Sequence, residues 1–206
     1  MKKNSYGGLF IVFEGLDGSG QSTQAALLKE YFLTQSRRVF LTKEPTLWTK
    51  DGRRIKEILD EKESIAPLKL QELFVADRAE HLAREIIPAL RQGIIVICDR
   101  YFFSTIAFGG LDTSIDKLVQ MNDEFIYPDQ TFFLRVRPEV CMSRINRRGQ
   151  GAQFFEKMEK LQKIAQNYGE IIKIFSDIKV IDGEKSIKEI HQKILSVLAD
   201  NQKRRE

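Results

Sequence analysis

Residues 13–23 have the types and spacing needed to hold phosphate groups. The segment reads Phe-Glu-Gly-Leu-Asp-Gly-Ser-Gly-Gln-Ser-Thr, with three glycines in six residues. Glycines let a turn fold its backbone N–H groups inward at the positive end of a helix, and the hydroxyl of Ser22 is placed to ligate Mg²⁺. The segment therefore predicts a site for the phosphates of a nucleotide. The residues expected to form it are Gly15, Asp17, Gly18, Ser19, Gly20, Gln21, Ser22 and Thr23.

The full phosphate-loop pattern, G-x-x-x-x-G-K-[ST], is incomplete, because Gln21 stands where the lysine belongs. Gln21 can donate a hydrogen bond but carries no charge, which predicts a loss of about tenfold in phosphate affinity unless another cation compensates. Without its lysine the pattern arises by chance about 0.07 times in a chain of this composition. An ordinary glycine-rich turn between a strand and a helix therefore stays open as the alternative.

Asp99 and Arg100 follow the apolar run Ile94–Cys98 and so lie at the carboxyl end of a predicted strand. Open α/β sheets bind their ligands at this edge. A carboxylate there can hold Mg²⁺, which makes Ser22 and Asp99 the predicted metal ligands, and a neighbouring arginine can grip a phosphate through two parallel hydrogen bonds. A structural salt bridge is the alternative for this acid–base pair.

Phe74 and Arg78 lie four residues apart in a predicted helix and therefore share one of its faces. Such a pair can stack a nucleotide base and hydrogen-bond its edge. The alternative is that Phe74 is a core residue. Glu44-Pro45 ends the second predicted strand, where the proline restricts the conformation of the residue before it.

The elements that position these residues alternate between strands and helices. Short apolar runs predict strands at 9–13, 38–41, 94–98, 131–136 and 179–181. Longer amphipathic segments predict helices at roughly 21–35, 52–61, 68–91, 113–126, 138–148, 154–175 and 186–200. This alternation is typical of a parallel sheet wrapped by helices. We expect one α/β domain over residues 1–206, in which the segment 147–153 is either a mobile loop or an ordinary helix connection.

The composition fits a globular protein and excludes a largely disordered one, with 206 residues of which 42% are hydrophobic. No run approaches the ~18 apolar residues of a membrane span, and the first residues do not resemble a signal peptide. We therefore expect a cytoplasmic protein without a membrane partner. The net charge of +4 is small and the basic segments are short, which favours an anionic small molecule over nucleic acid as the partner.

Cysteine and histidine offer little chemistry in this chain. Cys98 and Cys141 stand alone in apolar or helical contexts, so we expect two buried thiols and neither a disulfide nor a cysteine-based metal site. His81 and His191 are expected to be surface or capping residues rather than ligands.

Taken in order, these motifs and two further segments resemble the thymidylate kinase family. The matching segments are Phe13–Gly20, Glu44-Pro45, Phe74–His81, Asp99-Arg100-Tyr101, Ser104–Phe108 and Tyr127-Pro128-Asp129. The resemblance extends from about residue 9 to 195. It implies a three-layer P-loop fold with a five-stranded parallel sheet, flanking helices and a mobile lid at about 144–153. It also implies transfer of the γ-phosphoryl group of ATP, with Mg²⁺, to dTMP, giving dTDP for dTTP synthesis.

The resemblance further implies roles for single residues. Asp17 would touch the acceptor sugar and approach the donor phosphates. Phe74 would stack the thymine ring, and Arg78 would read its edge. Arg100 would hold the acceptor phosphate, and Phe108 would crowd the sugar near C2′ and so favour deoxyribose. The other expected substrate contacts are Glu44, Pro45, Asp99, Ser104 and Thr105.

Family members place their catalytic arginines either in the phosphate loop or in the lid. Here Arg144, Arg147 and Arg148 cluster in the lid region, so the chain looks like the second kind. Arg144 and Arg148 would neutralise charge on the transferring phosphoryl group, and a solvated helix end is the alternative. The residues expected to be catalytic are Asp17, Arg100, Arg144 and Arg148. Family members are commonly homodimers, which makes a homodimer the expected assembly.

Two departures from the family pattern leave three functions open. Gln21 replaces the loop lysine, and Gly109 stands where a glutamine often follows the Ser104–Phe108 segment. The first function is an active thymidylate kinase. The second is a kinase of the same fold acting on another nucleotide or nucleoside. The third is a non-catalytic nucleotide-binding module that lost its chemistry with the lysine.

Overall fold

The structure, a computed structural model, describes residues 1–146 and 154–203, and the side chains of 1–146 and 157–200. Five parallel strands form its main sheet in the order β3-β4-β2-β6-β7. They are β2 (Phe10–Gly15), β3 (Val39–Lys43), β4 (Ile95–Asp99), β6 (Gln130–Arg135) and β7 (Lys179–Asp182). All five correspond to predicted strands, and the predicted parallel sheet is confirmed.

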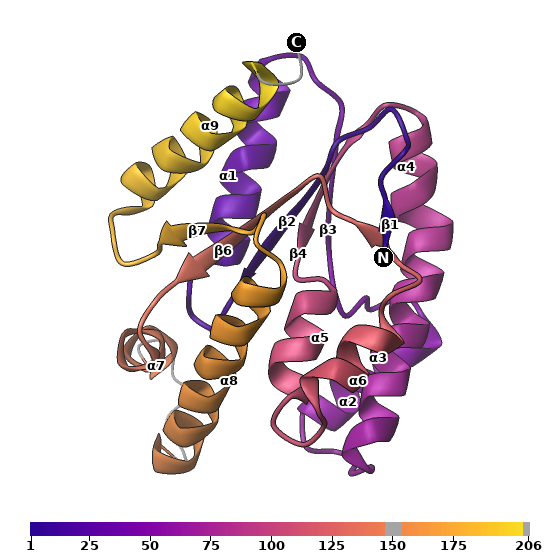
Figure 1. The fold of residues 1–206 in the computed structure, drawn as a ribbon, viewed down its shortest axis with the longest axis vertical. Coiled ribbons are helices and arrows are strands. Elements are labelled where there is room, and N and C mark those ends of the chain that lie inside the picture. Colours follow the sequence, from indigo (N-terminus) through magenta and orange to yellow (C-terminus); the bar gives the residue numbers. More distant parts are fainter. Residues whose placement is uncertain (147–153, 204–206) are drawn as a thin grey trace.

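Helices cover both faces of this sheet (Figure 1). They are α1 (Gln21–Thr34), α2 (Lys50–Leu59), α3 (Pro67–His81), α4 (Ile87–Arg91), α5 (Phe102–Gly109), α6 (Ile115–Met121), α7 (Pro138–Asn146), α8 (Phe154–Ile174) and α9 (Ile187–Lys203). A π-helical turn, Leu82–Ile86, joins α3 to α4. The predicted helix 68–91 therefore corresponds to α3, this π-helical turn and α4, which follow one another without a gap.

The side chains of β2 point alternately to the two faces of the sheet, which explains why helices pack on both faces and form three layers with it. Ile11 and Phe13 point to one face and pack with residues of α1 and α9, whereas Phe10 and Val12 point to the other and pack with α4, α5 and α8. Both faces of β2 are fully buried, as expected of a central parallel strand. In Figure 1, α1 and α9 lie side by side on one face of the sheet, opposite α5 and α8.

The structure differs from the sequence prediction at three places. Helix α5 was not predicted. The predicted helix 113–126 is reduced to α6, which ends where the Asn122 side chain donates to the Leu118 carbonyl. A second, two-stranded sheet pairs β1 (Lys2–Lys3) with β5 (Ile126–Tyr127), a length too short to give a periodic pattern.

The carboxyl ends of β2, β3 and β4 meet at one edge of the sheet. Phe13 and Lys43 are the neighbours of Asp99 in the strand register. The residues that follow these strands are therefore gathered at the edge where α/β sheets bind ligands. Among the described helices, none combines the length and the apolar composition that a membrane span requires.

Candidate functional site

The turn between β2 and α1 is shaped to receive an anion. Gly18 and Gly20 have φ angles of 82° and 98°, in the left-handed region that glycine adopts without strain. A Cβ atom at Gly18 would also lie only 2.8 Å from the carbonyl oxygen of Cys141. Gly20 is the N-cap of α1, and no side chain caps this helix. The first N–H groups of α1 are thus available to a phosphate at the positive end of the helix.

Gln21 is the first residue of α1, directly after this turn, and is 5% exposed. Its Oε1 accepts a 3.0 Å hydrogen bond from the Ser19 hydroxyl. Because the hydroxyl occupies the carbonyl end of the amide, the NH₂ end remains to donate. The side chain that replaces the loop lysine is therefore held by its neighbour and presents a neutral donor.

Ser22 and Asp99 are brought together as predicted. The Ser22 hydroxyl donates to Asp99 Oδ2 at 2.5 Å, and Lys43 Nζ lies 3.4 Å from the same oxygen. Asp99 Oδ1 is buried and has no partner among the described residues. An unpaired carboxylate oxygen beside a serine hydroxyl is a donor set of hard oxygen ligands, which fits Mg²⁺.

Arg100 points back across the phosphate turn. Its Nη2 donates to Asp17 Oδ1 at 2.6 Å, and its Nη1 donates to the Gly15 carbonyl and to Ser104 Oγ at 3.0 and 2.8 Å. The guanidinium carbon lies 5.0 Å from the centre of the Phe108 ring. Arg100 has a φ of 75°, a conformation that costs a non-glycine residue about 1–3 kcal/mol and that is often retained at functional sites.

Glu14, which the sequence analysis gave no role, joins the phosphate turn to α5. Its carboxylate is 1% exposed and accepts from the N–H groups of Tyr101 and Ser104 at 2.8 and 3.2 Å. It also accepts from the Ser104 hydroxyl at 2.5 Å and from the Tyr168 hydroxyl at 2.8 Å. Burial raises the pKa of Glu14 to about 7, although these donors and Arg100 favour its charged form.

Arg78 connects several predicted substrate contacts at the other end of the site. It is 1% exposed, and its Nε donates to Glu44 Oε2 at 2.8 Å. Its Nη2 donates to Thr105 Oγ1 at 2.7 Å, and its Nη1 donates to Asn122 Oδ1. Glu44, Arg78 and Thr105 are therefore brought together. Asn122 completes the group, and the sequence analysis missed it.

The aromatic residues predicted to surround the acceptor are only partly covered. Phe74 and Phe108 are half-buried, on α3 and α5. Pro45 is half-buried and follows a cis peptide bond after Glu44. Phe74 is therefore not a fully buried core residue, because part of its side chain is exposed.

The expectation that His81 is a surface or capping residue is wrong. His81 is fully buried, with Nε2 2.7 Å from Thr42 Oγ1 and Nδ1 3.2 Å from Glu44 Oε1. It lies three residues after Arg78, on the face of α3 that packs inward. Cys98 lies beside His81, and its thiol donates to the Arg100 carbonyl. Both side chains therefore have hydrogen-bond partners within the protein. His191 is half-buried on α9.

Arg144 reaches the phosphate turn from α7. Its Nη1 lies 3.4 and 3.3 Å from the carbonyl oxygens of Gly18 and Ser19, and its Nη2 donates to the Gly183 carbonyl at 3.0 Å. Arg144 is thus placed beside the turn, where it holds the carbonyl groups. Arg147, Arg148 and the rest of the predicted loop 147–153 lie outside the described residues.

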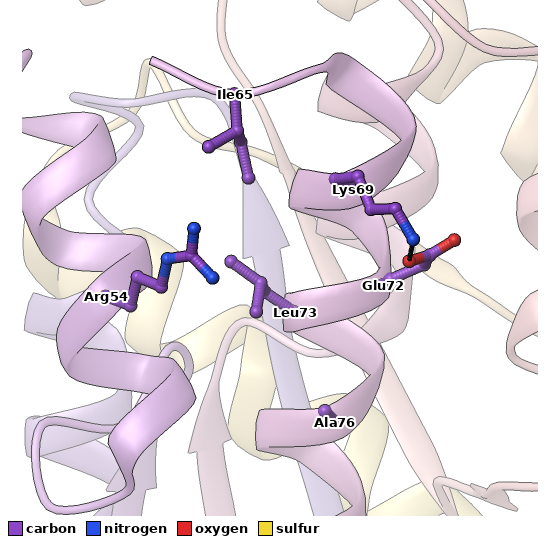
Figure 2. A pocket seen from close by; sticks show the side chains of 6 residues that line it. All are labelled: Arg54, Ile65, Lys69, Glu72, Leu73 and Ala76. Carbon is purple, nitrogen blue, oxygen red and sulfur yellow. Dashed lines mark hydrogen bonds and ion pairs between the residues drawn. The ribbon is translucent and has the colours of Figure 1, made fainter. Parts of the chain in front are cut away.

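A hollow of about 340 Å³ opens between α2 and α3, away from the residues above (Figure 2). It is lined by Arg54, Ile65, Lys69, Glu72, Leu73 and Ala76. Lys69 and Glu72 on its rim pair with each other at 2.7 Å. None of the predicted site residues lines this hollow, so it does not belong to the candidate site.

The comparisons with known proteins agree with the geometry at this edge of the sheet. The family model described as Thymidylate kinase matches residues 13–194. A probable thymidylate kinase of Pyrococcus horikoshii is 38% identical over 199 residues, covering 93% of this chain and 96% of the relative. The thymidylate kinase of Caldicellulosiruptor saccharolyticus is 33% identical over 205 residues, covering 96% and 99% of the two chains. The chain belongs to the thymidylate kinase family.

Proposed function

We propose that this chain transfers the γ-phosphoryl group of ATP to dTMP and produces dTDP for dTTP synthesis. The observation that carries the proposal is the position of Arg100, whose guanidinium spans from Gly15 and Asp17 at the phosphate turn to Ser104 on α5. This position places a cation between a donor cradle and a second, aromatic-lined region. A phosphate-to-phosphate transfer requires such an arrangement.

The donor half of the site is the turn itself. The backbone N–H groups at the start of α1 and the amide of Gln21 would bind the ATP phosphates. Ser22 and Asp99 would hold Mg²⁺, which would neutralise part of the charge of the phosphates when bound. Gly15, Gly18, Ser19, Gly20 and Thr23 complete the proposed donor site.

The acceptor half is assigned to residues on α3 and α5, after β3 and β4, and in the phosphate turn. Arg100 would hold the dTMP phosphate, and Asp17 and Phe108 would contact the sugar. Phe74 and Arg78 would contact the base, with Glu44, Pro45, Ser104 and Thr105 around it. Two arginines, a phosphate turn and half-exposed rings provide the charge and the apolar surface that a nucleoside monophosphate requires.

The chemistry consists mainly of positioning. The oxygens of the acceptor phosphate are already ionised near neutral pH, so the transfer needs no nucleophilic side chain and no strong general base. Arg100 and Arg144 would stabilise charge around the transferring group. Arg148 would join them from the proposed lid at 144–153, whose closure would exclude water and suppress ATP hydrolysis.

The two alternatives are not favoured. Family membership over 13–194 supports a nucleoside monophosphate kinase. The Ser22–Asp99 pair and the Arg100–Asp17 pair are both present, and a module that only bound a nucleotide would not require both. Gln21 keeps a hydrogen-bond donor in the turn, so the chemistry is weakened rather than lost.

A coupled ADP-release assay tests the proposal. Purified enzyme with MgATP is offered dTMP, dUMP, dCMP, dAMP and thymidine in parallel. Turnover that depends on dTMP and falls about 100-fold in Arg100→Ala supports the proposal. Faster turnover of another acceptor indicates a kinase of the same fold with a different substrate, and nucleotide binding without turnover of any acceptor indicates the non-catalytic module.

We further propose a homodimer in the cytoplasm, with residues 1–206 forming one kinase domain. Light scattering coupled to size-exclusion chromatography measures the mass directly, against 23.9 kDa for one chain. A mass of one chain at micromolar concentration would contradict the dimer. A single cooperative unfolding transition would support one domain.

A further inference from the structure

Gln71 is a buried polar side chain whose amide oxygen has no hydrogen-bond donor in the described part of the chain. It lies on α3 and is 6% exposed, and its Oε1 is buried without a partner among the described residues. A buried amide oxygen without a donor destabilises the folded protein, because water satisfies it in the unfolded chain. Such a group requires an explanation, and a ligand that supplies the missing donor provides one.

The position of Gln71 places it at the proposed base site. Phe74 and Arg78 follow it by three and seven residues on α3, so the three side chains form one stripe of the helix. At one end of the stripe Arg78 donates to Thr105 on α5. At the other end Gln71 lies against Gly109, four residues further along α5. Gln71 and Arg78 therefore bracket Phe74 along the contact between α3 and α5.

Gly109 makes room for this amide. A Cβ atom at Gly109 would lie 2.8 Å from both Cδ and Oε1 of Gln71. Any other residue at position 109 would therefore collide with the amide or displace it. At this contact α5 contributes no side chain, because residue 109 is glycine, and the carboxamide of Gln71 from α3 fills the space.

We propose that Gln71 is a specificity-determining residue that pairs with the imide edge of the thymine base. This inference rests on the proposed function. Thymine presents an N3–H donor beside the O4 acceptor, and a carboxamide presents an acceptor beside two donors. Gln71 Oε1 would accept from N3–H while its NH₂ group donates to O4. Arg78 carries no acceptor, so it cannot pair with N3–H.

Titration calorimetry with two ligands tests the role of Gln71. The parent, Gln71→Leu and the control Gln120→Leu, which removes an exposed glutamine of α6, are each titrated with dTMP and with 2-deoxyribose 5-phosphate. We expect Gln71→Leu to bind dTMP about tenfold more weakly and the sugar phosphate unchanged, because only the base loses a hydrogen bond. Gln120→Leu should match the parent with both ligands.

A second probe and a second variant separate recognition from packing. The parent should bind 3-methyl-dTMP, which lacks the N3–H group, at least tenfold more weakly than dTMP, and Gln71→Ala should lose this preference. Gly109→Gln alone should bind dTMP poorly, whereas Gln71→Ala combined with Gly109→Gln moves the carboxamide to α5 and should recover binding.

Equal affinity of the parent and Gln71→Leu for dTMP overturns the proposal, as does an equal loss for dTMP and the sugar phosphate. A parent that binds 3-methyl-dTMP as well as dTMP also overturns it. These binding measurements are independent of turnover. A parent that binds dTMP with the expected preferences but does not phosphorylate it therefore contradicts the proposed function and supports the role of Gln71.

Discussion

Glu14, at the end of β2, accepts a 2.8 Å hydrogen bond from the backbone N–H of Tyr101, 87 residues away. The same carboxylate oxygen accepts from the N–H of Ser104. Two N–H groups at the start of α5 are thereby satisfied by a side chain from another element, where a helix usually relies on its own N-cap residue. Helix α5 is thus fixed directly to the strand that precedes the phosphate turn.

The burial of Glu14 predicts a pH dependence of stability. Burial raises its pKa from 4.5 to about 7, so the folded protein holds a proton that the unfolded chain has lost between these values. Stability from this group is complete below pH 4.5 and decreases as the pH rises to 7, by roughly 3 kcal/mol. Glu14→Gln removes the titration and should flatten the free energy of unfolding, measured in urea, over this range.

A matched control for Glu14 is Glu124→Gln. Lys2 lowers the pKa of Glu124, an exposed residue, so its titration lies below this pH range. Glu124→Gln should therefore keep the parent's decrease in stability between pH 4.5 and 7. The pH dependence would have another source if the Glu14→Gln variant kept the parent's slope as well.

The strained backbone of Arg100 allows its chemical role to be separated from its structural cost. Arg100→Ala and Arg100→Gly both remove the guanidinium, and each should lower kcat/KM for dTMP by about 100-fold, because a charged contact to phosphate is lost. The φ of 75° is strained for alanine but free for glycine. Arg100→Gly should therefore be more stable than Arg100→Ala by about 1 kcal/mol.

Steady-state kinetics and urea unfolding of the two variants check these expectations. Arg100→Lys, which keeps the charge without the planar fork, provides the intermediate case. Full activity in either neutral variant would show that Arg100 does not bind the phosphate of dTMP. Equal stabilities of the glycine and alanine variants would show that the backbone conformation is not strained.

The sequence predicted the sheet well and one central helix not at all. The strands were found because both faces of β2 and β4 are buried, which leaves uninterrupted apolar runs. Helix α5 is buried on nearly every side, so Phe102–Gly109 has no polar face and no 3.6-residue period. The N–H groups at its start are capped by Glu14, which is distant in the sequence. The spacing of residues within the helix therefore cannot indicate that contact.

The same distinction applies to the candidate site. Ser22 and Asp99 lie together because Ser22 follows β2 and Asp99 ends β4, parallel strands whose carboxyl ends share one edge of the sheet, and the strand pattern indicates that edge. Asn122 was missed because its bond to Arg78 joins residues 44 apart, one on α3 and the other directly after α6. Tyr168, which donates to Glu14 from α8, was missed for the same reason. A polar residue that ends an apolar strand, as Glu14 does, is the signal that could have indicated the contact with α5.

The two cysteines should be inert in the folded protein. Burial raises the pKa of the Cys98 thiol well above its ordinary value and that of Cys141 to about 12, and the thiolate is the reactive form. Ellman's reagent at pH 8 should detect no thiol in the native protein and two after unfolding in urea. Ser196→Cys, which places a thiol on the exposed face of α9, should react at once. Rapid reaction of the native parent would mean that the structure around a buried cysteine opens on the time scale of the assay.

Restoring the loop lysine tests how much the missing charge limits this kinase. Gln21→Lys places an ammonium group where a neutral amide is held by Ser19. A charge-assisted contact exceeds a neutral one by about 1–1.5 kcal/mol, so we expect roughly tenfold higher kcat/KM for ATP with little change in KM for dTMP.

Gln35→Lys, at the exposed end of α1, adds the same charge away from the turn and should leave the kinetics unchanged. A gain common to both variants would indicate general attraction of ATP, and salt should abolish it. A Gln21→Lys variant no faster than an active parent would show that the charge is already supplied. Lys43 Nζ lies 3.4 Å from Asp99, one of the two proposed metal ligands, and Lys43→Met should then lower kcat/KM for ATP.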